Sequence, residues 1–190
     1  DLTLGGNYTW SESEGNTEGE NRGSGPVPAT ELQYPEYKDL SWNAPEGKLL
    51  IDQTHKLGVW AIFDLFETER QRMSLSGVQR YFSGSAYSAF GPVASRNYVT
   101  NPGYNTPPAS VNYYFSGRGA YRTDDITQTD LGINYSFFFG DVEVFSQVDI
   151  TNIFNEDGAL LVNQAVFTNA NDSSLLPFNP FTETPVEGVH

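Results

Sequence analysis

The sequence TDLGINYSFFFGDVEVFSQVDITNIF, residues 129–154, is the stretch that decides the fold class of this chain. Apolar and polar residues alternate through it, and a two-residue turn, Gly140-Asp141, divides it into halves. The apolar positions are Leu131, Ile133, Tyr135, Phe137 and Phe139 before the turn, and Val142, Val144, Val148 and Ile150 after it. Strict alternation indicates two β-strands, each with one apolar and one polar face. The stretch is therefore predicted to form a β-hairpin.

The length of these two strands favours a membrane environment. Strands of about ten residues, tilted by roughly 45°, cross the hydrocarbon core of a bilayer. Long amphipathic strands with aromatic residues near their ends are typical of transmembrane β-barrels, in which apolar side chains face lipid and polar ones face the lumen. We therefore predict an all-β fold, an antiparallel up-and-down transmembrane β-barrel segment.

Five long strands are expected along the chain, near residues 1–10, 54–65, 71–82, 127–139 and 142–154. Short turns follow the second and fourth strands, whereas long loops occupy residues 11–53, 83–126 and 155–190. Outer-membrane barrels have this connectivity, with short turns in the periplasm and long loops outside the cell. Residues 1–190 are thus interpreted as one partial barrel domain in a bacterial outer membrane.

Polar positions on these strands are expected to line the lumen, where they contact water or a plug more often than a ligand. The lumen-facing candidates are Asn7, Thr9, Lys56, Asp130, Asn134, Glu143, Gln147 and Asp149. In the second strand the apolar face is formed by Leu57, Val59, Ala61, Phe63 and Leu65. The third strand alternates least regularly, with Met73 and Leu75 on the apolar side.

Tyrosines gather in the predicted loops, and we consider six of them as candidates for ligand recognition: Tyr34, Tyr37, Tyr98, Tyr104, Tyr113 and Tyr114. A tyrosine side chain offers a large contact area and a polar hydroxyl with little conformational entropy to lose, which suits a recognition surface. The alternative is that these rings pack the loops against one another.

The composition excludes several functional classes. The chain has 190 residues, of which 38% are hydrophobic, and no run approaches the roughly 18 apolar residues of a transmembrane helix. A formal net charge of −14 argues against nucleic acid or anionic lipid as a partner, because both require basic patches. The absence of cysteine excludes disulfides and thiolate metal sites.

Catalytic and metal-binding motifs find little support. The two histidines, His55 and His190, cannot assemble a His/Cys zinc site without cysteine. Nucleophile-elbow, phosphate-loop and dinucleotide-binding motifs do not occur. An acidic run offers carboxylates for Ca²⁺ but lacks the spacing of a calcium loop, so a solvated loop is favoured for Glu12, Glu14, Glu18 and Glu20. We predict no enzymatic activity, no cofactor and no metal.

The two ends of the chain suggest an internal fragment of a longer protein. The chain begins with Asp1, without a signal peptide, and ends in a loop-like tail that contains residues 179–185. A segment of five strands would leave unpaired strand edges, whereas a barrel must close. We therefore expect the isolated segment to aggregate or to require detergent.

Four motifs resemble the C-terminal barrel of TonB-dependent outer-membrane receptors, especially the Oar-like group of Gram-negative bacteria. They lie in this order along the chain: Leu32–Asp39 (LQYPEYKD), Tyr98–Tyr104 (YVTNPGY), Arg118–Asp125 (RGAYRTDD) and Asp149–Asn155 (DITNIFN). The last is similar to the Asn-(Leu/Ile)-Phe-Asn signature that closes the penultimate strand in this superfamily.

The resemblance implies a 22-stranded parent barrel, with these five strands as numbers 17 to 21. It also implies a plug domain, an inner-membrane TonB complex as energy source, and transport of a ligand whose identity the sequence leaves open. The plug, the TonB-contacting box and the last strand lie outside this sequence. A segment of this kind is expected to be unable to transport by itself.

Three alternatives remain open. A soluble β-sandwich also has alternating strands, although its strands usually have about 5–6 residues and its loops are short. A soluble β-rich module could bind carbohydrate or another ligand through the tyrosine-rich loops. A secreted β-sandwich hydrolase would use two carboxylates as acid and base.

Overall fold

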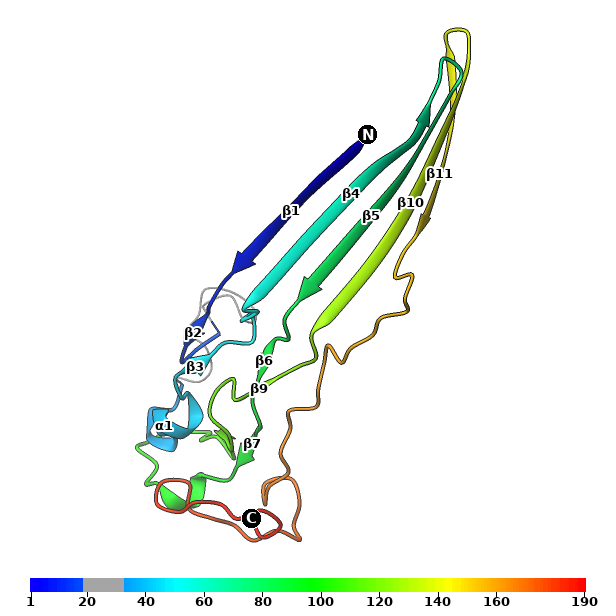
Figure 1. Cartoon of the computed structure of the whole chain (residues 1–190). Coiled ribbons are helices and arrows are strands. Elements are labelled where there is room, and N and C mark those ends of the chain that lie inside the picture. The colour runs from blue at the N-terminus through cyan, green and yellow to red at the C-terminus, as the bar shows by residue number, and fades with distance from the viewer. Residues whose placement is uncertain (19–32) are drawn as a thin grey trace. The chain divides into compact units, whose positions relative to one another are not determined.

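The computed structural model describes residues 1–18 and 33–190, and it shows a mostly β chain with antiparallel sheets (Figure 1). The predictions made for Glu20 and Leu32 lie outside the described residues. The chain is divided into two compact units. The strand unit comprises Asp1–Glu12, Gln53–Gly84 and Thr123–Leu160, and the loop unit comprises Ser13–Asp52, Ser85–Arg122 and Leu161–His190.

The strand unit contains a five-stranded sheet. Its strands are β1 (Leu2–Trp10), β4 (His55–Glu67), β5 (Gln71–Phe82), β10 (Ile126–Phe139) and β11 (Val142–Ile150). The spatial order is β1-β4-β5-β10-β11, and each strand is antiparallel to its neighbours (Figure 1). Spatial order thus follows sequence order, as in an up-and-down meander. The prediction of a mainly β, antiparallel fold is confirmed at this level.

The five-stranded sheet is open at both edges. Within the described residues, β1 pairs only with β4, and β11 pairs only with β10. No closed barrel is therefore found in residues 1–18 and 33–190. In the described part of the chain, no helix is both long and apolar enough to cross a membrane.

The predicted alternation is interrupted in β4 by a β-bulge. Asp64 pairs with Ser74, but Phe66 pairs with Met73, so one extra residue, Leu65, enters β4 between them. Strict alternation would place Phe66 on the polar side. The bulge instead brings it to the same face as Met73. Alternation alone cannot reveal such an insertion.

The last strand is shorter than predicted. β11 ends at Ile150, whereas the sequence pattern suggested a strand up to Phe154. The reason is the backbone of Asn152 and Asn155, which both adopt the left-handed conformation with φ of 51°. A left-handed residue cannot continue a strand, and asparagine tolerates this conformation better than most other residues.

The loop unit has secondary structure of its own, where the sequence predicted only loops. Among the described residues, three small two-stranded sheets pair β2 (Glu14–Gly15) with β3 (Gly47–Lys48), β6 (Ala86–Tyr87) with β9 (Tyr121–Arg122), and β7 (Phe90–Val93) with β8 (Val111–Tyr114). The helical elements that the structure describes are η2 (Pro35–Tyr37), α1 (Leu40–Asn43) and η3 (Arg96–Tyr98).

A hydrophobic core holds these short elements together. Tyr37, Trp42, Val93, Val111 and Phe178 form a buried cluster, each no more than 7% exposed. Asp39 caps α1 by accepting a hydrogen bond of 2.8 Å from the backbone N–H of Ser41, which begins the short helix that carries Trp42. The loop unit is therefore a packed structure rather than a set of independent loops.

Candidate functional site

One face of the five-stranded sheet is apolar across all of its strands. Residues that are paired in register share a face of the sheet, and one such row consists of Leu2, Phe63, Leu75, Ile133 and Val148. The next row consists of Leu4, Ala61, Gly77, Leu131 and Ile150. We call this surface the apolar face. Its side chains are exposed, with Leu4 at 67% and Val148 at 54%.

Aromatic residues lie toward both ends of the apolar face. Tyr8 and Trp10, each 60% exposed, lie at the end from which the long connections leave. The Tyr8 hydroxyl is 2.8 Å from Nδ1 of His55. Phe137 and Phe139 lie near the Gly140 turn, with ring centroids 4.4 Å apart. The aromatic residues therefore flank the aliphatic rows on both sides.

The opposite surface, the polar face, carries all eight candidates that the sequence assigned to a lumen. Register places Thr9 opposite Lys56, Asn134 opposite Gln147, and Asp149 opposite Gly132. The other three candidates share this parity: Asn7, Asp130 and Glu143. They lie on one face, as the alternation predicted; that this face lines a lumen stays a prediction.

The polar face is not uniformly polar, because Trp60 lies across β1 at Gly5. A Cβ atom at Gly5 would be 2.3 Å from the Trp60 ring, so only glycine leaves space for the indole there. Beside it is a shallow hollow of about 260 Å³, whose lining includes Asn7, Lys56 and Arg80. The face therefore combines cationic groups with aromatic surface.

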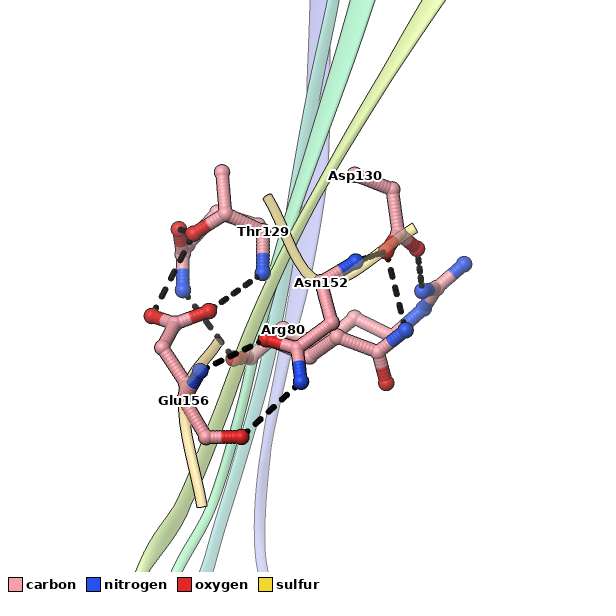
Figure 2. A network of polar contacts seen from close by, with 7 residues as sticks. Arg80, Thr129, Asp130, Asn152 and Glu156 are labelled. Atoms are coloured by element: carbon pink, nitrogen blue, oxygen red, sulfur yellow. Dashed lines mark hydrogen bonds and ion pairs between the residues drawn. The ribbon is translucent and has the colours of Figure 1, made fainter. Parts of the chain in front are cut away.

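Asp130 is the centre of a polar network on β10 (Figure 2). Its carboxylate accepts hydrogen bonds from the Arg80 guanidinium, from the Gln128 amide at 2.9 Å and from the Asn152 backbone N–H at 2.9 Å. Arg80 and Asp130 form an ion pair between β5 and β10. Asp130, one of the lumen candidates, thus binds the backbone of Asn152, just after the end of β11.

Asn152 and Glu156 complete this network (Figure 2). The Asn152 amide donates to the Glu156 carbonyl at 2.9 Å, and the Glu156 N–H donates to Asn152 Oδ1 at 2.8 Å. The Glu156 carboxylate accepts the Thr129 N–H at 2.7 Å. We call residues 152–156 the Asn152 clamp. The Asn-Ile-Phe-Asn motif therefore has a local structural role: it ends β11 and fastens the following segment to β10.

The six tyrosine candidates are distributed over the core of the loop unit and its surroundings. Tyr37 is only 1% exposed and belongs to the core. The Tyr34 ring meets the Tyr104 ring edge-on at 4.9 Å, and Tyr113 stacks on Trp42 at 5.3 Å. Tyr114 stacks on Phe90 at 5.6 Å, and Tyr98 is half-buried in η3. Rings packed in this way hold the loops together, and their contact with a ligand stays a prediction.

Two of the quoted motifs meet within the loop unit. Asn101 accepts the backbone N–H of Tyr104 at 2.8 Å, and the Tyr104 hydroxyl donates to Glu36 at 2.7 Å. The hydrogen bond to the Glu36 carboxylate raises the pKa of the Tyr104 hydroxyl above its ordinary value. The segments around Glu36 and Asn101 are therefore joined side by side.

Two carboxylates of the acidic run form ion pairs in the part of the chain that the structure describes. Lys48 pairs with Glu14 at 2.9 Å, and Arg118 pairs with Glu18 at 2.7 Å. No group of three or more His, Cys, Asp or Glu residues suited to a metal ion occurs in residues 1–18 and 33–190. Salt bridges account for these two carboxylates.

The sequence analysis did not predict that two charged side chains of the loop unit, Arg118 and Asp52, are buried. The Arg118 guanidinium, 1% exposed, donates to Glu18, to the Asn16 carbonyl and to the Pro45 carbonyl, and lies 4.9 Å from the centre of the Tyr114 ring. No local pattern distinguishes Arg118 from a solvated loop arginine, because its partners lie about a hundred residues away.

Asp52 is the second missed charge. Its side chain is 1% exposed and is paired with Arg122. Burial alone would raise the pKa of Asp52, but hydrogen bonds from Ser13 and Arg122, with the positive charges of Arg122 and Lys48, outweigh it and lower the pKa. The carboxylate is thus held in its charged form inside the loop unit.

Comparison with known proteins gives the chain no family. No protein-family model, no curated protein and no solved structure matches it. The similarity of the four motifs to TonB-dependent receptors therefore stays a prediction based on the residues themselves.

Proposed function

We propose that this chain is part of the wall of an outer-membrane β-barrel of the TonB-dependent receptor type, which passes a ligand across the outer membrane. The observation that carries the proposal is the apolar face, whose row of Leu2, Phe63, Leu75, Ile133 and Val148 crosses all five long strands with each side chain at least 37% exposed. Soluble monomers rarely expose a contiguous apolar patch larger than a few hundred Å². Lipid is the covering that this surface fits best.

The dimensions of the strands support a membrane wall. The five strands contain 9, 13, 12, 14 and 9 residues. A tilted transmembrane strand requires about 9–11 residues, so each strand is long enough to cross the hydrocarbon core. Tyr8 and Trp10 at one end of the apolar face and Phe137 and Phe139 at the other match the aromatic girdles of such barrels.

The open edges support a place within a larger barrel. Backbone groups on β1 and β11 face away from their single partners, and unpaired groups of this kind cannot remain in lipid. Further strands that pair with both edges would satisfy them. The mixed polar and charged residues of the polar face suit a wet interior. In the receptor, the loop unit would capture the ligand and a plug domain would control its passage.

A soluble ligand-binding module is the second candidate. The observation in its favour is the buried aromatic core of the loop unit, which needs no lipid. In such a module, however, the apolar face would require a protein covering. Within the described residues, every buried hydrophobic side chain belongs to the loop unit, and none lies on the apolar face.

Neighbouring residues on β10 provide the test. Ile133 lies on the apolar face, and Asn134 lies next to it on the polar face. Arginine facing lipid near the bilayer midplane costs about 2–4 kcal/mol. We expect Ile133→Arg and Leu131→Arg to abolish outer-membrane assembly of the full-length protein, whereas Asn134→Arg leaves it nearly unchanged. Assembly is measured by heat-modifiable migration in gels and by protease protection in the membrane fraction.

The outcomes separate the two candidates. Normal membrane assembly of both apolar-face variants would contradict the barrel. Equal loss of assembly in the Asn134→Arg control would show that the apolar face has no special contact with lipid. Purification of the full-length protein as a soluble, cooperatively folded monomer would favour the soluble module.

A further inference from the structure

The loop unit contains a hollow of about 510 Å³ that the core and the ion pairs leave unfilled. Its lining includes five aromatic rings: Tyr113, Tyr114, Phe115, Tyr121 and Phe167. We call it the aromatic pocket. Small-molecule sites in proteins generally have volumes of about 300–1,000 Å³ and combine apolar walls with a few polar groups. The aromatic pocket meets both conditions.

Other rings hold the walls of the aromatic pocket in place. Tyr113 stacks on Trp42 at 5.3 Å and meets Phe178 edge-on at 5.5 Å. Tyr121 packs on Tyr87 at 5.3 Å. Because these rings are already ordered, a ligand that lies against them loses little binding energy to the ordering of side chains. The pocket is pre-formed in this sense.

Two rings of the aromatic pocket are open to solvent, Phe167 at 68% and Tyr121 at 46% exposure. An isolated exposed aromatic residue is ordinary on a protein surface. Here both rings line one hollow together with three further rings, those of Tyr113, Tyr114 and Phe115. They are therefore accessible to a ligand that enters it.

The polar groups of the aromatic pocket favour a neutral ligand. The Tyr113 hydroxyl has no hydrogen-bond partner among the described residues, and burial raises its pKa, so it is a neutral donor and acceptor. The Glu187 carboxylate and the Thr184 hydroxyl add oxygen atoms to the lining. The lining that the structure describes includes neither lysine nor arginine; its histidine, His190, accepts the Val186 backbone N–H at Nδ1. Glu187 would repel an anion.

We propose that the aromatic pocket binds a neutral sugar ring. A pyranose has an apolar face of C–H groups, which fits against an aromatic ring, and a rim of hydroxyls, which needs hydrogen-bond partners. The aromatic pocket offers both. A second hollow of about 500 Å³ in the loop unit is lined by Gly15, Leu40, Glu46 and their neighbours. Its described lining has no aromatic ring and so lacks the first requirement.

The inference that a sugar is the ligand of a receptor rests on the proposed function. The inference that the aromatic pocket binds a sugar does not. The test uses the full-length protein, folded as judged by its far-UV circular dichroism. The probes are malto-, cello-, galacto- and mannopentaose, with a galacturonate pentamer as the anionic comparison, all measured by isothermal titration calorimetry. We expect at least one neutral pentaose to bind, and the anionic oligomer to bind at least tenfold more weakly.

Substitutions locate the binding site. Phe167→Ala and Tyr121→Ala each remove an exposed ring, and we expect each to weaken binding of the neutral pentaose at least tenfold. Tyr121→Phe keeps the ring and is expected to weaken it less. The matched control is Leu161→Ala in the same unit, at a side chain that is 92% exposed and outside the pocket lining, and it is expected to bind normally.

Three outcomes would overturn the inference. In the first, none of the four neutral sugars binds the folded protein. In the second, a sugar binds but neither ring substitution weakens it. In the third, the galacturonate oligomer binds more tightly than every neutral pentaose. None of these results bears on Ile133→Arg and membrane assembly, so the two proposals can fail separately.

Discussion

The strand unit and the loop unit differ in whether they bury a cluster of apolar residues, although both expose some. In the strand unit, leucine, isoleucine and valine stand on the apolar face with side chains as much as 67% exposed. In the loop unit, the cluster around Trp42 and Phe178 is at most 7% exposed. The loop unit therefore carries a core of the kind that water produces. The strand unit does not, and its apolar residues require another partner.

The difference also concerns distance along the chain. The apolar face is made by residues two positions apart on each strand and by neighbouring strands that follow one another in sequence. The core of the loop unit joins Tyr37, Val111 and Phe178, which come from three separate segments of the chain. Local periodicity describes the first unit and says little about the second.

Removal of the Arg118 guanidinium should have the largest effect of the changes that test this comparison. Arg118→Ala would remove the cationic partner of the Glu18 carboxylate inside the loop unit. Loss of one member of a buried ion pair costs about 3–5 kcal/mol. We expect the loop unit to become sensitive to limited proteolysis, whereas membrane assembly, which depends on the strand unit, is retained.

Arg96→Ala is the control for this change, because Arg96 is exposed and its guanidinium donates a hydrogen bond to the Pro107 carbonyl. It should leave the digestion pattern almost unchanged. If Arg118→Ala left the protease resistance of the loop unit intact, the unit would not depend on its buried charges. If it prevented membrane assembly, the two units would not be energetically separate.

Much of the sheet could be predicted from the sequence, because alternation and turn length are local properties. The third strand was placed at residues 71–82, and β5 covers Gln71–Phe82. The errors arose where a single residue breaks the period. Leu65 enters β4 as a bulge, and Asn152 turns the backbone out of β11. Neither event changes the local composition enough to be recognised in advance.

The loop unit could not be predicted in the same way. Its tyrosines were identified as a group, but their division between core and pocket depends on partners from distant segments. Tyr37 is buried and Tyr113 lines the aromatic pocket, although both occur in similar polar surroundings in the sequence. Of the exposed rings of that pocket, Tyr121 belongs to the loop tyrosines but not to the six candidates, and Phe167 was not a candidate at all. No pattern in the chain indicates that they lie close together.

The Asn152 clamp should have the next largest effect. Asn152 and Asn155 have the same left-handed φ of 51°, but only the Asn152 side chain has hydrogen bonds in this turn. Glycine accepts this conformation, so Asn→Gly removes side-chain bonds without backbone strain. Two lost hydrogen bonds predict a cost of about 1–3 kcal/mol for Asn152→Gly.

Asn155→Gly is the matched control and should be nearly neutral. Urea denaturation of the detergent-solubilised protein, followed by circular dichroism, measures both variants. Equal destabilisation by the two substitutions would mean that the backbone conformation, rather than the side-chain bonds, makes the clamp. A larger loss of stability for Asn152→Gly than for Asn155→Gly would show that the side-chain hydrogen bonds of Asn152 stabilise the turn after β11.

Acid should weaken the loop unit through Asp52. Folding lowers the pKa of this carboxyl below its ordinary value of 3.8, so the charged form stabilises the folded state. The contribution is complete above about pH 5 and is lost as the pH falls through the lower value of the folded state. Asp52→Asn should lack this acid-dependent component.

The fluorescence of Trp42 provides the measurement, in a background where Trp10 and Trp60 are replaced by phenylalanine. At pH values below 4, the stability of the loop unit should decrease more steeply with falling pH in that background than in the same background with Asp52→Asn. Parallel pH profiles would show that the Arg122 pair does not stabilise the charged carboxylate. Asp172→Asn serves as the comparison, because its side chain is bonded only to nearby Ser174.

The smallest change in stability is expected for a substitution of Phe145, the most exposed phenylalanine of the five-stranded sheet. Its comparison with a substitution of Val148 distinguishes the two faces of the sheet most directly. Phe145 is 74% exposed, more than Val148 at 54%, yet it lies on the polar face opposite Ser136. Hydrophobicity and exposure alone would make Phe145 the better lipid contact. Its position in register makes Val148 the lipid contact instead. Phe145→Arg should therefore change stability by no more than about 0.5 kcal/mol.

Val148→Arg should cost about 2–4 kcal/mol, because its row also contains Ile133 and Leu75 on the apolar face. Urea-induced unfolding of both variants in lipid vesicles gives the comparison. A larger loss for Phe145→Arg than for Val148→Arg would place lipid on the polar face and reverse the assignment of the two surfaces. A small effect of Phe145→Arg beside a large effect of Val148→Arg would show that register, rather than hydrophobicity, determines which side chains meet the bilayer.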